Sequence, residues 1–459
     1  MVDAELAKET AAGRIIGPFT EPPWHNLRTS GIGVVPKKNG KWRAILHLSA
    51  PEGHSVNDHI NKDEFSIHYS SVDDAVALLS QYGQDALMAK VDLKAAFRLI
   101  PVRAADWVHL GICWQDQFYV DTCLPFGLRS APALFNHYAE ALHWIMANRH
   151  GAQLLHYLDD FLLVGPPGRD TCQEAMSRML MVCDHLGIPV ASEKLEGPTP
   201  ALTFLGIVLD TSAKQLRLPP DKLEELTGLT RCWLGRHKAT KRELLSLIGK
   251  LSFAAKVVPA GRLFLRRLID LSTTARKLHH HVTLNAEARA DIKWWEDFLP
   301  SWNGVAMFLE PEWTTADSLQ LFTDASGSLG FGAYFKGAWL RGDWQPHQCL
   351  PLRSIQWQEL FAIIAAASTW GHHWSGLRIH FHCDNLPIVQ AWARQSSKHP
   401  DLMQLLRTLF LVAAQNNFTI RMSHLPGRLN RIADALSVPG TKETITLFAA
   451  HLSQSLNSS

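Results

Sequence analysis

Three carboxylates are the residues of this 459-residue chain best suited to metal chemistry. Asp159 and Asp160 join two apolar runs within residues 154–165, and Asp92 ends a third apolar run that begins at Ala89. Adjacent carboxylates in an apolar frame are costly to bury unless a cation neutralises them. Oxygen ligands of this kind are those that Mg²⁺ prefers. The simpler alternative is that Asp159 and Asp160 only form a turn.

The elements around these acids should bring them together. Apolar residues flank the acidic pair, and Gly151 and Gly165 bound the stretch, which predicts a β-hairpin with Asp159 and Asp160 at its turn. A strand that ends in Asp92 and runs into a short helical turn would place the third acid beside the pair. Two metal ions about 3.5–4 Å apart on such acids can activate an attacking hydroxyl and stabilise a leaving phosphate oxygen. This is the chemistry of a nucleotide polymerase.

These residues carry a resemblance to the reverse transcriptases of retroelements. Tyr157-Leu158-Asp159-Asp160 resembles the YxDD motif of that family, and Asp92 lies in the motif that precedes it. The resemblance extends from about Glu5 to about Val438 and is strongest to the DIRS-type, tyrosine-recombinase retrotransposons. It implies an α+β and α/β multidomain chain, with a right-hand polymerase of fingers, palm and thumb. Two Mg²⁺ ions, with Mn²⁺ as the alternative, would serve each active site.

A cationic hairpin is the first candidate for nucleotide binding. Asn39-Gly40, the strongest short hairpin signal, lies between two apolar runs, and Lys38 and Arg43 lie close to this turn. A solvated turn would explain these cations equally simply. In the resembled family the matching fingertip neutralises the triphosphate of the incoming deoxynucleotide.

A glycine-bearing turn that leads into a helix is the second candidate. Phe126 and Gly127 lie in this turn, and the missing Cβ of Gly127 would let backbone approach a flat ligand closely. The stretch is similar to the family motif that holds the template and the incoming nucleotide. Phe97, five residues after Asp92, resembles the aromatic gate that excludes a 2′-hydroxyl, although it could simply be a core residue. Lys194 resembles the family lysine proposed to protonate the departing pyrophosphate, although a surface lysine is the alternative.

The segment 221–299 is basic and mostly helical in pattern. Between Arg231 and His281 there are twelve Lys or Arg residues and two acids. This pattern predicts a thumb that follows the phosphate backbone of a primer–template, with a solvated helix face as the alternative. The candidate nucleic-acid contacts are Phe204, Leu205 and Gly206, which match the primer-gripping turn of the family, and the arginines Arg262, Arg266 and Arg267.

A second set of acids follows a Pro- and Trp-rich stretch at 300–318 that predicts a linker. Three strands, a helix, a strand, helices and a further strand are expected after it. Three strands, a helix, a strand and helices is the element order of the ribonuclease H fold. The acids in this region are Asp324 after the first strand, Glu359 on the first helix, Asp384 after the fourth strand and Asp434 on the last helix. An isolated strand-end Asp is usually a cap, but four acids in this order resemble the ribonuclease H family. The family assigns them two metal ions that cut the RNA strand of an RNA/DNA hybrid. His424 matches its mobile histidine near the scissile phosphate.

These patterns divide the chain into five predicted parts. Residues 1–212 are fingers and palm, 213–299 thumb or connection, 300–318 linker, 319–440 a ribonuclease H-like domain and 441–459 a tail. Neither the recombinase nor the methyltransferase that such elements encode has room here, so an element-encoded recombinase is an expected partner.

Composition agrees with an ordered protein that works inside the cell. Hydrophobic residues make up 46% of the chain and the net charge is +2, so any nucleic-acid site must be a local patch. Seven widely spaced cysteines without zinc-ligand spacing favour a reducing compartment, the cytoplasm or the nucleus. The N-terminus is no signal peptide, and no apolar run could cross a membrane. Two alternatives remain: a degenerate or domesticated remnant that binds nucleic acid without turnover, and a nuclease with a vestigial polymerase.

Overall fold

The computed structural model divides the chain into two compact units, Met1–Leu205 and Gly206–Ser459. It describes residues 1–424 except for 37–41, 303, 307–311, 320, 345–352, 384, 396 and 398. Lys38, Asp384 and Asp434, three of the predicted site residues, lie outside the described residues.

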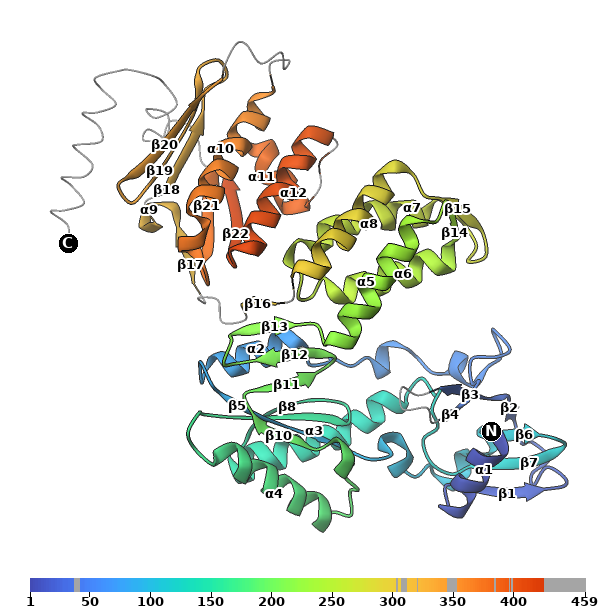
Figure 1. Cartoon of the computed structure of the whole chain (residues 1–459). Helices are drawn as coiled ribbons and strands as arrows, with labels where there is room; N and C mark the ends of the chain where they lie inside the picture. The colour runs from blue at the N-terminus through green and yellow to red at the C-terminus, as the bar shows by residue number, and fades with distance from the viewer. Residues whose placement is uncertain are drawn as a thin grey trace. The chain divides into compact units, whose positions relative to one another are not determined.

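One part of the first unit is built on an antiparallel sheet with the strand order β10-β5-β9-β8, found in Figure 1 by the labels β5, β8 and β10. Its strands are β5 (Leu87–Asp92), β8 (Gln153–Tyr157), β9 (Asp160–Gly165) and β10 (Glu196–Thr199). Helices α3 (Ala131–His150) and α4 (Thr171–His185) pack on the sheet and on each other, and α2 (Val72–Ser80) also contacts β8 and β9. The core between them includes the fully buried Phe161, Leu163 and Met146. The predicted hairpin and the predicted strand up to Asp92 are both confirmed.

A second sheet of the first unit has the order β1-β7-β6-β2. Its strands are β1 (Ile15–Phe19), β2 (Thr29–Ser30), β6 (Gly111–Trp114) and β7 (Gln117–Asp121). The two strands of the predicted hairpin are also present, because β3 (Ile32–Pro36) pairs antiparallel with β4 (Trp42–Leu46). Its turn residues Asn39 and Gly40 lie outside the described residues. Helix α1 (Val2–Ala11) packs on β1, β3 and β4. The unit also contains strand β11 (Ala201–Phe204) and five short 3-10 helices: η1 (Val56–His59), η2 (Asp63–Phe65), η3 (Ala96–Leu99), η4 (Ala104–His109) and η5 (Ser192–Lys194).

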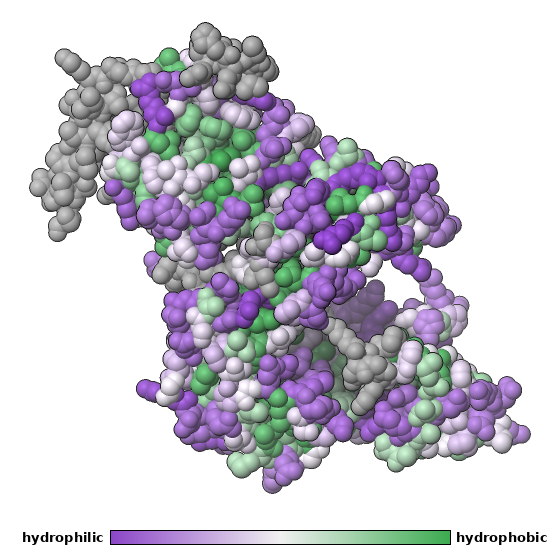
Figure 2. Space-filling model, in the orientation of Figure 1, coloured by the Kyte–Doolittle hydropathy of each residue, from purple (hydrophilic) through white to green (hydrophobic). Residues whose placement is uncertain are grey.

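The basic segment at the start of the second unit is helical, as predicted. Its helices are α5 (Pro220–Leu234), α6 (Lys241–Ala254), η6 (Pro259–Phe264), α7 (Arg266–Thr273), α8 (Ala286–Phe298) and η7 (Leu299–Ser301). This part of the unit also contains short strands. Strand β13 (Gln215–Arg217) pairs with β12 (Ile207–Asp210) and with β16 (Val305–Ala306), and β14 (Lys238–Thr240) pairs with β15 (His281–Thr283). Hydrophilic residues cover much of its visible face (Figure 2).

The rest of the second unit has the predicted order of three strands, helix, strand, helices and strand. Strands β18 (Leu321–Ala325), β19 (Gly330–Phe335) and β20 (Ala338–Asp343) form an antiparallel sheet, with α10 (Ile355–Trp370) packed on β18 and β19. Strand β21 (Arg378–Cys383) pairs in parallel with β22 (Thr419–His424), and α11 (Leu386–Arg394) and α12 (Pro400–Gln415) cover them.

The predicted linker at 300–318 is too long. Trp313–Thr315 forms strand β17, which pairs in parallel with β21, and helix α9 (Ala316–Leu319) follows it. The Pro and Trp residues around this strand obscure its pattern in the sequence, and β21, its ladder partner in the described part of the chain, lies more than 60 residues away. Among the described residues, no helix combines the length and the apolar character that a membrane crossing requires.

Candidate functional site

Strand pairing brings the three carboxylates of the first unit together. Asp92, the last residue of β5, is the direct partner of Asp160, the first residue of β9. The turn between β8 and β9 is Leu158-Asp159, with Leu158 in the left-handed region at φ 54°. The carbonyl oxygen of Asp159 accepts a hydrogen bond from the backbone N–H of Leu93 at 2.9 Å, which ties the turn to the end of β5. The prediction that Asp92, Asp159 and Asp160 converge is confirmed.

The surroundings disfavour three negative charges on these acids. Asp92 is buried, and Asp159 and Asp160 are half-buried. Burial, the hydrogen bond with Asp92 and the charges of Asp92 and Asp159 raise the pKa of Asp160 to about 7. Burial and the charge of Asp92 also raise the pKa of Asp159, against the opposing charges of Lys194 and Arg43. A cation beside these acids would favour the state in which all three groups are ionised together.

One cation of the protein already lies on these acids. The Lys194 ammonium group donates to both carboxylate oxygens of Asp92, at 2.8 and 2.7 Å, although its side chain is 54% exposed. Partial burial lowers the pKa of Lys194, but the hydrogen bond and charge of Asp92 outweigh this effect and raise the pKa above its ordinary value. The site thus attracts positive charge, and its oxygen donors suit a hard divalent cation. Within the described part of the chain, no group of three or more acids, histidines or cysteines is arranged to hold a metal ion. A metal ion on Asp92, Asp159 and Asp160 would have to displace the Lys194 ammonium group from Asp92.

Three of the predicted nucleotide-binding residues, Arg43, Phe97 and Phe126, lie close together. The Arg43 guanidinium lies over the Phe126 ring, with Cζ 4.5 Å from the ring centroid. The Phe126 ring is 5.4 Å from the ring of Phe97, which in turn lies 5.6 Å from the ring of Phe135 in the core. The structure therefore brings Arg43, Phe97 and Phe126 into one group, with Phe97 half-buried between Phe126 and the core.

Gly127 is needed for a different reason from the one that the sequence suggests. It has φ +110°, and a Cβ atom there would lie 2.1 Å from the carbonyl oxygen of Leu46 in β4. The close approach is therefore to the protein's own backbone. The approach of a flat ligand to this turn stays a prediction. The glycine lets this turn dock against the hairpin that carries Arg43.

The predicted primer-gripping residues fall at the border of the two units. Phe204 is fully buried, so its side chain cannot contact nucleic acid, and that part of the prediction is corrected. Leu205 adopts φ 47° and ends the first unit. In the second unit, the carbonyl oxygen of Gly206 accepts a hydrogen bond from the Lys222 ammonium group at 3.0 Å, and this group also lies 3.9 Å from the centroid of the Phe253 ring.

The three candidate arginines of the thumb differ in their surroundings. Arg262 and Arg266 are exposed, and Arg266 pairs with Asp270 one turn along α7 at 3.1 Å. Arg267 is only 23% exposed and lies 3.8 Å from the fully buried carboxylate of Asp291. Burial raises the pKa of Asp291 to about 6 in spite of its neighbouring arginines. Arg407 donates a hydrogen bond to the same carboxylate, and Arg267 adds a second, longer ion pair. These contacts argue against the assignment of Arg267 as a phosphate contact.

Asp324 and Glu359, the two described candidate acids of the ribonuclease H-like segment, lie on neighbouring elements. Asp324 lies within β18, one residue before its end, and Glu359 lies on α10, which packs on β18. The thiol of Cys383, the last residue of β21, lies 3.8 Å from a carboxylate oxygen of Glu359. Cys383 is also the direct partner of His424 in β22. Glu359 and His424 therefore approach the same end of β21, the strand that Asp384 follows in the sequence.

Two residues that hold the Phe126-Gly127 turn were missed in the sequence. The Asn57 side chain donates a hydrogen bond to the carbonyl oxygen of Gly127 and accepts one from the backbone N–H of Arg129. The Arg129 guanidinium donates to the carbonyl oxygens of Asn57 and Ile60. Asn57 lies about 70 residues from the turn, in a polar stretch with no periodic pattern, so no local signal indicates its role.

Comparison with known proteins agrees with this geometry. Residues 35–209 match the family described as "Reverse transcriptase (RNA-dependent DNA polymerase)". This stretch of the chain is similar to a reverse transcriptase domain. The match covers β4, β5, the β8–β9 hairpin and η5, and thus every carboxylate of the first site and Lys194.

The matched stretch and the segment after it also resemble parts of viral and transposon polyproteins. The chain is 20% identical over 416 residues to Polyprotein P3 of Commelina yellow mottle virus, which covers 87% of this chain and 20% of the polyprotein. It is 21% identical over 426 residues to the Transposon Tf2-3 polyprotein of Schizosaccharomyces pombe, covering 88% and 28%. With the Gag-Pro-Pol polyprotein of Mason-Pfizer monkey virus the identity is 26% over 221 residues, covering 46% and 12%. The chain thus spans less than a third of each relative.

Solved structures show the same fold for both parts of the chain. The foamy viral protease-reverse transcriptase dRH in complex with double-stranded DNA has a TM-score of 0.56 at 16% identity, covering 92% of this chain and 69% of the other. The foamy viral protease-reverse transcriptase in complex with an RNA/DNA hybrid has a TM-score of 0.53 at 17% identity, covering 96% and 54%. The fold is a right-hand polymerase followed by a ribonuclease H-like domain, as predicted.

Proposed function

We propose that this chain is an RNA-directed DNA polymerase that also cleaves the RNA strand of RNA/DNA hybrids. The observation that carries the proposal is the direct pairing of Asp92 with Asp160, with Asp159 in the adjoining turn and the Lys194 ammonium group on Asp92. Divalent metal ions bound there, Mg²⁺ or Mn²⁺, would activate the primer 3′-hydroxyl and stabilise the leaving phosphate oxygen.

The other residues of the domain bind and orient the deoxynucleoside triphosphate. Arg43, held over the Phe126 ring, offers its guanidinium to the triphosphate. Phe97 presses on the sugar, where it leaves no volume for a 2′-hydroxyl. Lys194 provides a proton for the departing pyrophosphate once its ammonium group leaves Asp92. A template with its primer lies along the exposed cations Arg262 and Arg266 of the helical segment.

The ribonuclease H activity belongs to a separate site. Glu359 lies near the end of β21, with His424 on the neighbouring strand. We propose that Asp324 and Glu359, together with Asp384 and Asp434, hold the metal ions of this site, and that His424 assists release of the cut strand. The foamy viral relative that was solved with an RNA/DNA hybrid supports a hybrid as the substrate class.

The origin and setting of the chain are also part of the proposal. The order and the residues of its motifs favour an origin in a DIRS-type element. A neighbouring reading frame that encodes a tyrosine recombinase would support this origin. The absence of zinc-ligand spacing among the cysteines favours an intracellular location, in the cytoplasm or the nucleus.

Primer extension on poly(rA)/oligo(dT) with Mg²⁺ tests the polymerase, and cleavage of a labelled RNA/DNA hybrid tests the nuclease. Asp159→Asn should abolish extension and leave cleavage largely intact, whereas Glu359→Gln should do the reverse. Loss of both activities from either substitution in a folded protein would contradict two separate sites. A folded wild-type protein that extends no primer would favour a nucleic-acid-binding remnant instead.

A further inference from the structure

Asn57 lies at the centre of a hydrogen-bonded group that holds the Phe126-Gly127 turn. Its side-chain NH₂ donates to the carbonyl oxygen of Gly127 at 2.8 Å and to the Ser49 hydroxyl at 2.9 Å. Its side-chain oxygen accepts from the backbone N–H of Arg129 at 2.8 Å. The residue is only 3% exposed. The Asn57 amide group thus forms hydrogen bonds with the Gly127 carbonyl oxygen and the Arg129 N–H, one on each side of Leu128.

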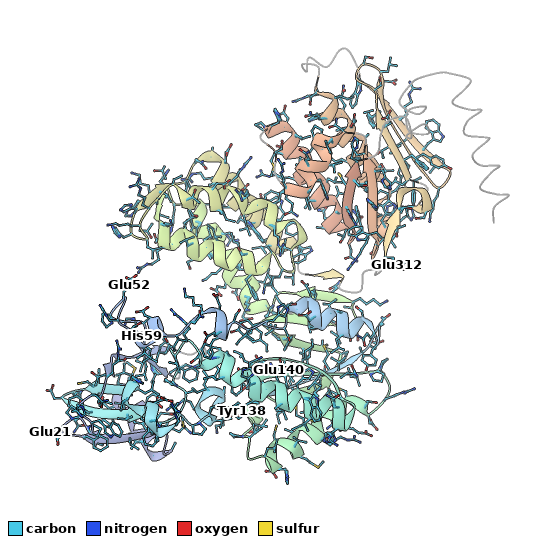
Figure 3. All side chains as sticks on the ribbon, turned by 180° about the vertical axis from the view of Figure 1, so that it is seen from behind. Glu21, Glu52, His59, Tyr138, Glu140 and Glu312 are labelled. Carbon is cyan, nitrogen blue, oxygen red and sulfur yellow. The ribbon has the colours of Figure 1, made fainter. Side chains whose placement is uncertain are left out.

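The position of Asn57 does not depend on these side-chain bonds. It lies in η1 (found in Figure 3 by the label of His59), which is closed at its start by reciprocal bonds between Ser55 and Asp58. The backbone N–H of Asn57 also donates to the carbonyl oxygen of Leu48 at 3.0 Å, and Leu48 is buried in the core of the unit. The side chain is therefore presented from a rigid base.

The turn is held from a second side by β4. The backbone N–H of Leu46 donates to the carbonyl oxygen of Phe126 at 3.0 Å, and Gly127 packs against the carbonyl oxygen of Leu46. Asn57 and Leu46 together fix the peptide units on either side of Phe126 and Gly127. The Phe126 ring that this arrangement presents contacts both Arg43 and Phe97.

We infer that Asn57 is a positioning residue for the incoming nucleotide. It does not contact the metal-binding acids or the substrate. It fixes the position of the Phe126 ring between Arg43, which would bind the triphosphate, and Phe97, which would contact the sugar. Removing its NH₂ group would leave the Gly127 carbonyl without this donor, and a buried acceptor that loses its partner shifts the local structure. This inference rests on the proposed polymerase function.

Asn57→Asp provides the sharpest test, because it keeps the size and one oxygen of the side chain but replaces the donor to Gly127 with a second acceptor. We expect KM for the deoxynucleotide to rise roughly tenfold while kcat changes much less. The dissociation constant of the deoxynucleotide should rise equally in Ca²⁺ with a chain-terminated primer, where no chemistry occurs. The affinity for primer–template should stay the same.

Two control variants separate positioning from general stability. Ser49→Ala removes the third bond of the same amide but leaves both bonds to the turn, so KM should stay within about twofold of wild type. Leu142→Ala lowers the melting temperature through a cavity in the core behind α3, where Leu142 is buried, without touching the turn. It too should leave KM unchanged.

Each outcome decides the role of Asn57. An Asn57→Asp protein that is less heat-stable but binds the deoxynucleotide within twofold of wild type would overturn the inference, as would an equal rise in KM in Leu142→Ala. If wild-type protein binds no deoxynucleotide, the proposed function fails and this role fails with it. If wild type binds and Asn57→Asp binds equally well, the role alone fails.

Discussion

Lys194 holds both carboxylate oxygens of Asp92, at 2.8 and 2.7 Å, across 102 positions of the sequence. The two oxygens are those that a divalent cation would use, so the ammonium group and the cation compete for one ligand. Lys194 is more than half exposed, so the ion pair is stabilising but can be displaced. Metal binding would release the ammonium group toward the triphosphate.

Lys194→Met should therefore bind Mn²⁺ more tightly in the absence of nucleotide. An ion pair worth about 1 kcal/mol corresponds to an increase in affinity of roughly 3- to 10-fold. Free Mn²⁺ can be measured by its electron paramagnetic resonance signal during titration. Lys94→Met removes an exposed lysine only two positions from Asp92 and controls for the loss of one positive charge nearby. Equal affinities in Lys194→Met and Lys94→Met would rule out direct competition.

Phe97→Ala should raise the incorporation of ribonucleotides relative to deoxynucleotides. The ring lies between Phe126 and the core residue Phe135, so its removal opens volume beside the sugar. The ratio of kcat/KM for the two nucleotides, in wild type and variant, is the measurement. Phe135→Leu disturbs the same core without opening the sugar side and serves as the control. A Phe97→Ala protein that loses both activities in parallel would identify the ring as a packing residue only.

Arg262 and Arg266 should differ from Arg267 in their effect on primer–template binding. Alanine at the two exposed arginines should flatten the slope of log affinity against log salt by roughly 0.7–0.9 per lost phosphate contact. Arg267→Ala should leave the slope unchanged but lower the free energy of unfolding by roughly 1–3 kcal/mol, because Asp291 loses a partner in a buried position. A slope that responds to Arg267 and not to the other two would reverse this assignment.

Glu9 should make the stability of the first unit depend on pH in the acid range. Despite its burial, hydrogen bonds and charge from Arg14 and Arg98 lower the pKa of Glu9 from 4.5 to about 2. The folded state therefore binds this proton less readily than the unfolded state. The resulting stabilisation, about 3 kcal/mol, is present above pH 4.5 and is lost as the pH falls toward 2.

Urea unfolding of wild type and Glu9→Gln from pH 3 to pH 7 measures this effect. The difference in stability between them should be constant above about pH 5.5 and should shrink below about pH 4.5. Asp121, on the other side of Arg98, opposes this trend, because burial raises its pKa to about 6 and its contribution falls as the pH rises. Both proteins contain Asp121, so the comparison largely cancels its contribution. A difference that does not change with pH would contradict the role assigned to Glu9.

The sequence by itself determined the acidic motifs and the order of the elements. Asp92, Asp159 and Asp160 stand beside apolar runs whose period and bounding glycines indicate strands and a hairpin, and that information is local. The same holds for Glu359 within its helix and for the hairpin of β3 and β4. Local pattern also separated the basic helical segment from the strands that come after it.

Only the tertiary structure decided which residues meet. The register that pairs Asp92 with Asp160 arises from strands almost 70 residues apart, and Lys194 reaches Asp92 only because η5 leads into β10, which pairs with β5. Burial, too, is a property of the whole fold. Arg267 was a candidate phosphate contact in the sequence, but in the fold it lies beside the buried carboxylate of Asp291. Asn57 is buried and holds a turn to which no sequence pattern connects it. Pairing register and burial depend on contacts between distant segments, and a sequence pattern describes only neighbours along the chain.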